Sequence, residues 1–195
     1  MDLVFLPATE PGDHAFGQMP TCADGSGNVR VHRISFQHMV WYNETVREEA
    51  ISQILALNLP KCVLAGFSKS GLGAWNITRM IPDRVAATVI FDAPVVRKEL
   101  PPWGTEPYYR DNEAWVADQP ACTVDNYAAR VPSAHRLVLI GGEIFHGEMR
   151  QLSARLWVAG ISHMHLHRPQ LAHHWRSGWL EEGLAALGEA GLWSS

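Results

Sequence analysis

The residue best placed to do chemistry is Ser68, within residues 65–73, whose sequence is AGFSKSGLG. A short apolar run precedes this serine and a helical pattern follows it, which predicts a tight turn between a strand and a helix. Such a turn strains the backbone of its serine and exposes the hydroxyl group. The residues two before and two after the serine must be small, and Gly66 and Ser70 meet that demand. The pattern therefore predicts a serine nucleophile.

Residues 66–71 resemble the nucleophile elbow of the α/β-hydrolase family, with Ser70 at the last small position in place of glycine. The resemblance runs from Leu3 to about Leu187, and it is to a small serine esterase. It implies an α/β fold with a mostly parallel central sheet, helices on both faces, and a start at the family's third strand. The implied activity is cleavage of a small-molecule carboxylic ester through an acyl-enzyme, by a Ser-His-Asp/Glu triad without a cofactor.

The resemblance also implies a histidine after the last strand, reaching back to Ser68 as the general base. Residues 171–179 supply His173 and His174 in a loop before the final helix. Their spacing does not separate the two. We favour His173 because small esterases place this histidine slightly further from the closing helix.

Three carboxylates are candidates for the triad acid. Most of the family places the acid after the strand before the last, where this chain offers Glu143 and Glu148. The other known position directly follows the preceding strand, where Asp92 stands. An aspartate at the carboxyl end of a strand is well placed to orient an imidazole and to stabilise its cation. We rank Asp92 first and keep both glutamates as alternatives.

The oxyanion hole of the family combines the N–H after the nucleophile with one from the loop after the first strand of this chain. The first would come from Lys69. Pro7 has no N–H to give, so Ala8 or Thr9 would supply the second, and we favour Thr9. Pro7 and Ala8 replace the His-Gly pair that is usual in the family.

Other kinds of site are less well supported. On a strand, His163, His165 and His167 would point the same way and could bind zinc, but neighbouring histidines on one flat strand rarely complete a tetrahedron. We therefore expect no metal site. The glycines do not form a dinucleotide-binding fingerprint. The competing hypothesis is a catalytically silent domain that keeps the hydrolase scaffold for binding or interaction.

The elements that must position these residues alternate along the chain. One helix should begin after Asn43, which is a good N-cap residue. Another should end just before Gly160, because glycine is favoured directly after the end of a helix. An irregular aromatic insertion at about 97–134 would form a small lid or a wall of the acyl pocket. The expected strands cover 3–6, 29–36, 61–67, 85–91, 136–140 and 161–167, and the other helices about 70–81 and 177–187. This order predicts a mostly parallel sheet.

Composition narrows the class of protein. The 195 residues, 47% hydrophobic and 18% charged, predict one globular domain over 1–195. A net charge of −4 disfavours nucleic acid and anionic membrane surfaces as partners. Three distant cysteines do not suggest a disulfide framework, and the first residues lack the pattern of a signal peptide. We expect a soluble cytoplasmic protein, whose open sheet edge would also allow two copies to pair.

Overall fold

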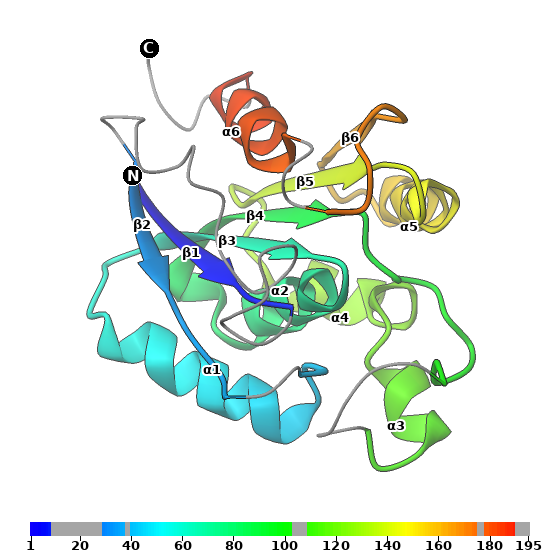
Figure 1. The fold of residues 1–195 in the computed structure, drawn as a ribbon, viewed down its shortest axis with the longest axis horizontal. Helices are drawn as coiled ribbons and strands as arrows, with labels where there is room; N and C mark the ends of the chain where they lie inside the picture. Colours follow the sequence, from blue (N-terminus) through cyan, green and yellow to red (C-terminus); the bar gives the residue numbers. More distant parts are fainter. Residues whose placement is uncertain (9–28, 38–39, 103–108, 175–177, 190–195) are drawn as a thin grey trace.

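The structure of the chain is a computed structural model that describes residues 1–8, 29–37, 40–102, 109–174 and 178–189 (Figure 1). Its centre is a six-stranded sheet in the order β2-β1-β3-β4-β5-β6. Each pair of neighbouring strands is parallel. The strands are β1 (Asp2–Leu6), β2 (Arg30–Arg33), β3 (Cys62–Phe67), β4 (Val85–Phe91), β5 (Arg136–Gly141) and β6 (Met164–His167).

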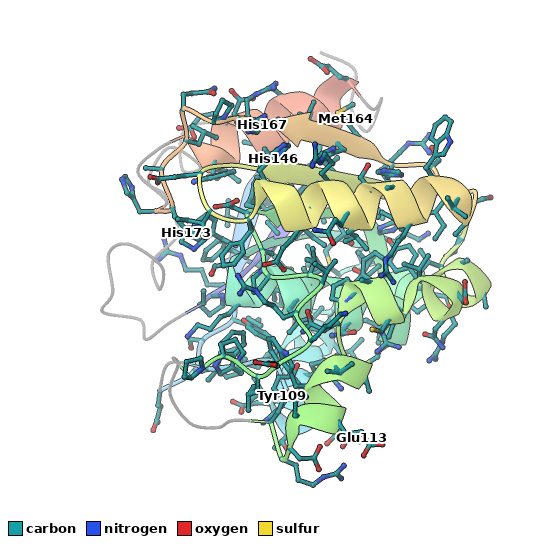
Figure 2. The ribbon with its side chains drawn as sticks, turned by 90° about the vertical axis from the view of Figure 1, so that its right-hand side faces the viewer. Tyr109, Glu113, His146, Met164, His167 and His173 are labelled. Carbon is teal, nitrogen blue, oxygen red and sulfur yellow. The ribbon has the colours of Figure 1, made fainter. Side chains whose placement is uncertain are left out.

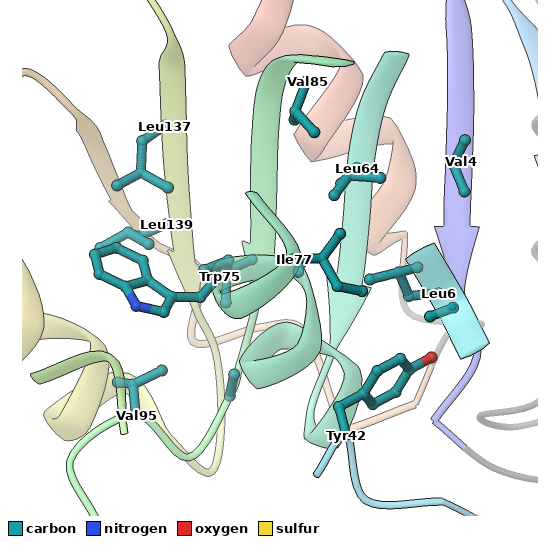
Figure 3. Close-up of a cluster of buried hydrophobic side chains, with 14 of the residues drawn as sticks. Val4, Leu6, Tyr42, Leu64, Trp75, Ile77, Val85, Val95, Leu137 and Leu139 are labelled. Carbon is teal, nitrogen blue, oxygen red and sulfur yellow. The ribbon is translucent and has the colours of Figure 1, made fainter. Parts of the chain in front are cut away.

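Helices cover both faces of this sheet, as the sequence predicts. Side chains alternate between the faces along each strand, so Val4 and Leu6 enter one core while Leu3 and Phe5 enter the other. The first core is covered by α1, α2, α4 and α5, and Figure 3 shows part of it. The second core is covered by α6. The helices are α1 (Glu44–Ala56), α2 (Lys69–Met80), α3 (Asn112–Ala117), α4 (Val124–Arg130), α5 (His146–Val158) and α6 (Trp179–Glu189).

Local sequence signals fix several helix ends. The Asn43 side chain accepts a hydrogen bond from the amide of Val46, which confirms the predicted N-cap of α1. Gly160 follows α5 with a φ of 70°, the left-handed conformation expected of a glycine there. Ser177, where the expected last helix begins, lies outside the described residues.

Two edge strands are shorter than the sequence pattern predicts. β2 ends at Arg33, although the pattern extends to Phe36. β6 begins at Met164, although the apolar run begins at Ile161. Both strands lie at the ends of the described sheet, where a strand pairs on one side only, so fewer hydrogen bonds extend it.

The segment 97–134 contains α3, α4 and a short 3₁₀ turn, Pro120–Cys122. The aromatic residues of this segment that the structure describes pack against one another and against the rest of the protein. Trp115 and Tyr109 pack edge-on against each other, and Trp115 also packs against Trp41. Tyr127 stacks on Trp75 of α2, with ring centroids 4.1 Å apart. Residues 103–108 lie outside the description, so the expected wall of an acyl pocket stays a prediction.

The helices described here are too short or too polar to cross a lipid bilayer.

Candidate active site

Four loops meet at one edge of the sheet. Parallel strands all end on the same side, so the residues that follow β3, β4, β5 and β6 are neighbours in space although they are distant in sequence. Ser68 follows β3, Asp92 follows β4, Gly142 follows β5, and His173 comes six residues after β6 ends. The registers Phe67 to Phe91 and Phe91 to Ile140 place the ends of β3, β4 and β5 level with one another.

Ser68 occupies the strained turn that the sequence predicts. Its φ is 55° and its ψ is −121°, a conformation that non-glycine residues seldom adopt. The amide of Ser68 donates to the carbonyl of Phe91 at 2.9 Å, and the Ser68 carbonyl accepts from Gly71 at 3.0 Å. These two bonds hold the turn between β3 and α2.

The small residues around Ser68 are required by packing. A Cβ atom at Gly66 would lie 2.2 Å from the carbonyl oxygen of Ser70, which is a backbone atom that cannot move aside. The hydroxyl of Ser70 is buried and donates to the Phe67 carbonyl at 2.9 Å. It also accepts from the Phe67 amide at 2.8 Å. Ser70 therefore closes the turn, whereas the Ser68 side chain makes no capping hydrogen bond to α2 and Ser68 is 7% exposed.

Asp92 is fully buried, and its carboxylate is saturated with hydrogen bonds. One oxygen accepts from the amides of Gly142 at 2.9 Å and Phe145 at 2.8 Å. The other accepts from the amide of Ile144 at 3.2 Å and contacts Nδ1 of His173 at 2.7 Å. Burial acts to raise the pKa of Asp92, but the bonds from His173, Gly142 and Phe145 outweigh it and hold the pKa below its usual value. Asp92 is therefore an anion at neutral pH.

The His173 imidazole is held by two aromatic side chains as well as by Asp92. Its imidazole lies against Phe67, with ring centroids 4.6 Å apart, and against Phe145, at 5.4 Å. Phe67 directly precedes Ser68, so the imidazole contacts the residue next to the serine. Because a carboxylate accepts at Nδ1, that nitrogen carries a proton and Nε2 is the basic nitrogen of the neutral ring.

Trp179, at the start of α6, contacts the loop that carries His173, although no sequence motif pointed to it. Its indole N–H donates to the carbonyl of Ala172, directly before His173, at 2.9 Å. Its ring packs against Phe67 at 5.5 Å, and a Cβ at Gly142 would collide with it at 2.2 Å. In the sequence, Gly142 stands just after the expected strand 136–140 and gives no sign of this contact. In the structure, Gly142 makes room for this indole, and its amide donates to Asp92.

The alternative residues have other contacts. Glu143 accepts from the backbone amide of His173 at 3.4 Å, so it contacts the main chain of this residue. Glu148 accepts from the amides of Val95 and Val96 and pairs with Arg97 at 2.6 Å.

The amide of the second candidate histidine, His174, donates to the Ala172 carbonyl at 2.7 Å. Of the candidates, the structure thus brings Asp92 to the His173 ring.

The two predicted oxyanion donors are described to different extents. Lys69 is the first residue of α2, where the helix dipole favours negative charge. Its ammonium lies 5.3 Å from the centre of the Trp41 ring. Thr9 lies outside the described residues. Ala8 is buried next to Pro7, whose carbonyl accepts from the Tyr42 hydroxyl at 2.7 Å.

The histidines near β6 do not form the predicted row. His163 precedes the strand, and its ring contacts Ser153 at 2.7 Å. His167 lies against His146 of α5 (Figure 2). These two rings stack with their centroids 3.4 Å apart, and the His165 ring centroid lies 5.7 Å from that of His146. Within the described residues, no group of three His, Cys, Asp or Glu side chains is arranged to hold a metal ion.

Comparison of the sequence with protein-family models and with curated proteins gives no match. Solved structures do match. A probable hydrolytic enzyme from Pseudomonas aeruginosa superposes with a TM-score of 0.56 at 14% identity, over 99% of this chain and 85% of that one. A carboxylesterase from Bacillus subtilis gives a TM-score of 0.57 at 15% identity, over 97% and 82%. Porphyromonas gingivalis dipeptidyl peptidase 4 gives 0.67 at 10% identity, over 96% of this chain and 30% of the peptidase.

These likenesses, together with the parallel sheet, establish the α/β-hydrolase fold that the sequence predicted. At such low sequence identities, these structural matches establish the fold only. Fold by itself does not name a reaction, so function must be argued from the site.

Proposed function

We propose that this protein is a serine hydrolase that cleaves carboxylic esters of small molecules through an acyl-enzyme. The observation that carries the proposal is the bond between Asp92 and Nδ1 of His173, beside a serine turn with a φ of 55°. This combination matches the roles of a nucleophile, a base and a group that orients the base. The hydrolytic activities named for two of the structural neighbours are in keeping with it.

In the proposed reaction, the Ser68 oxygen attacks the ester carbonyl carbon while His173 Nε2 takes the hydroxyl proton. The charged Asp92 stabilises the imidazolium that forms and keeps Nδ1 protonated. Collapse of the tetrahedral intermediate expels the alcohol, which receives the proton from His173. Water then attacks the acyl group on Ser68, again with His173 as the base, and releases the carboxylic acid.

The oxyanion of the tetrahedral intermediate would be held by the amide of Lys69 and by an amide after β1. The position of Lys69 at the start of α2 supports the first donor. Thr9 remains the proposed second donor. Removal of one such donor typically costs about 3 kcal/mol of transition-state stabilisation.

An active-site label tests the nucleophile. A fluorophosphonate probe is expected to label the protein on Ser68, and the Ser68→Ala variant is expected to remain unlabelled. Ser70→Ala is the matched control, because that hydroxyl is already engaged with Phe67. It should fold less stably but keep its label. Labelling that survives Ser68→Ala would contradict the assignment.

The leaving group is tested by matched substrates. p-Nitrophenyl esters of short and medium acyl chains should be turned over, and p-nitroanilides of the same acids should react much more slowly. Turnover of the anilides at a similar rate would replace the ester proposal by an amidase one. Absence of both turnover and labelling would favour the non-catalytic binding domain.

A further inference from the structure

The end of α5 carries two large apolar side chains that face water. Trp157 is 81% exposed and Val158 is 87% exposed. A single exposed apolar residue is ordinary, but a continuous exposed apolar patch marks a binding surface. The other end of this helix follows the loop around Asp92, so the two side chains lie one helix length, about 20 Å, from that loop.

Three hollows adjoin these two side chains. One, of about 350 Å³, is lined by Trp157, Ile161 and His163 among others. A second, of about 510 Å³, lies between α4 and α5 and is lined by Val158 and Ala159 among others. A third, of about 230 Å³, shares Ile161 with the first and Ala159 with the second. The three are therefore neighbours on one surface, and we refer to Trp157, Val158 and the residues that line these hollows as the α5-end face.

The α5-end face also carries one exposed charge of each sign beside Val158. Asp125 of α4 and Arg155 of α5 line the same hollow as this valine, and both are exposed. One N–H of the Arg155 guanidinium donates to the carbonyl of Ala121 at 2.9 Å, and the group has further N–H donors for a carboxylate. A face with one acid and one base can meet its own copy with opposite charges opposed. Its charge pattern is therefore complementary to itself.

We propose that the α5-end face binds a second copy of this chain about a twofold axis. In this pair, Trp157 of each copy enters the hollow beside Trp157 of the other, and Arg155 of each copy faces Asp125 of the other. A cavity of about 150 Å³ holds benzene, so a hollow of about 350 Å³ has room for an indole. The pairing removes both indoles and both Val158 side chains from water, which is the force that favours it.

Area and charge favour a second copy as the occupant. A specific interface buries roughly 1,200–2,000 Å² in total, and an aromatic side chain buries roughly 150–250 Å². The two Trp157 side chains alone would therefore supply about a quarter of that area, and the walls of the hollows of both copies add to it. The net charge of −4 disfavours nucleic acid and anionic membrane as occupants. Twofold pairs of identical chains are the commonest assemblies of soluble proteins.

Sedimentation equilibrium of the full chain tests the pairing. Between about 2 and 200 µM, the average mass should rise from 21.7 kDa toward twice that value. Trp157→Glu should keep the circular dichroism spectrum of the parent protein, because the side chain is exposed, and should stay monomeric throughout. Leu55→Glu is the matched control, since this leucine is also exposed but lies on α1, near the other edge of the sheet (Figure 1), and it should dimerise like the parent.

A charge swap tests the arrangement of the two copies. Asp125→Arg and Arg155→Asp should each weaken dimerisation about tenfold or more, because every contact occurs twice in a twofold pair. The double variant should regain the parent affinity within about threefold.

A parent protein that stays monomeric at every concentration would overturn the proposal. So would a double variant that stays as weak as the single ones. A dimer that survives Trp157→Glu would place the contact elsewhere, such as the open edge along β6, and would overturn it too. Ser68→Ala should dimerise like the parent, so the result does not depend on the proposed hydrolase activity.

Discussion

At the scale of single residues, the site depends on how each polar atom is matched. The Asp92 carboxylate accepts three backbone amides in addition to the His173 ring, so it is fixed in place before any substrate binds. A carboxylate held in this way keeps an imidazole in one tautomer and one orientation. At the opposite edge of the sheet, Tyr127 Oη and His135 Nε2 are buried polar atoms without a hydrogen-bond partner among the described residues.

Asp92→Asn tests the choice of the triad acid. An amide at this position can donate to the imidazole and favour the wrong tautomer, so kcat/KM for p-nitrophenyl esters should fall roughly a thousandfold or more. Glu143→Gln and Glu148→Gln serve as comparisons, and each should stay within about tenfold of the parent protein because neither side chain is bonded to the His173 ring in the structure. Full activity in Asp92→Asn would reverse the ranking.

His135 predicts a loss of stability in acid. Its pKa is lowered to about 4 in the folded protein, mainly by burial, whereas an unfolded histidine titrates near 6.5. Between these values the unfolded chain binds a proton that the folded chain does not. The stability is therefore intact above pH 6.5 and falls as the pH drops toward 4, by on the order of 3 kcal/mol in total.

The measurement is urea unfolding of the parent protein and of His135→Asn at pH 7 and pH 4.5. The asparagine amide can still donate to Val85 but does not titrate in this range. The difference in unfolding free energy between the two pH values should be clearly smaller in the variant. An identical acid loss in both proteins would show that other groups cause it.

At the scale of elements, close packing fixes the conformation of the turn between β3 and α2. Gly66 leaves no room for a Cβ beside Ser70, and a Cβ at Gly73 would lie 2.4 Å from the Tyr42 ring. These contacts seat the beginning of α2 closely against the chain around it. The conformation of Ser68 is therefore maintained by the packing of the helix, which compensates for its strain.

Gly66→Ala should disturb this turn. The added methyl group would meet backbone atoms at 2.2 Å, so the unfolding free energy should fall by about 2 kcal/mol or more and probe labelling of Ser68 should slow. The control is Gly147→Ala in the first turn of α5, where a Cβ would meet nothing within 4 Å. This change should stabilise the protein by about 0.5–1 kcal/mol. Equal stability of the two variants would contradict the steric account.

At the scale of the whole molecule, the segment 97–134 is tied to the body by a partly buried charge cluster. Asp118, just after α3, pairs with Arg47 of α1 and lies 3.6 Å from Arg79 of α2. The three side chains are 14%, 8% and 15% exposed. Three elements distant in sequence therefore share one carboxylate, on the same face of the sheet as the larger core.

Asp118→Asn leaves two guanidinium groups with little solvent and no compensating charge from this position. The unfolding free energy should fall by about 2 kcal/mol in urea titrations. Glu182→Gln is the comparison, because the pair of Glu182 with Arg168 is about one-third exposed on both sides and should cost less than about 1 kcal/mol. A smaller loss in Asp118→Asn than in Glu182→Gln would contradict the role assigned to the cluster.

The sequence by itself determined the features that depend on neighbours along the chain. Small residues around Ser68, the Asn43 cap, the alternation of strands with helices and the parallel sheet all follow from local sterics and periodicity. It also brought forward Asp92 and His173 as candidates. It ranked Asp92 first but left both glutamates as alternatives, because each of the three carboxylates follows a strand or begins a helix at the same edge.

Only the tertiary structure decided which carboxylate contacts the His173 ring. The strand register and the loop after β5, whose amides surround Asp92, determine this contact. The indole of Trp179 behind His173 was beyond local reasoning for the same reason, as was the stack of His146 on His167. These contacts join residues tens of positions apart. Their partners are chosen by the packing of the whole sheet and its helices, which no short window of sequence contains.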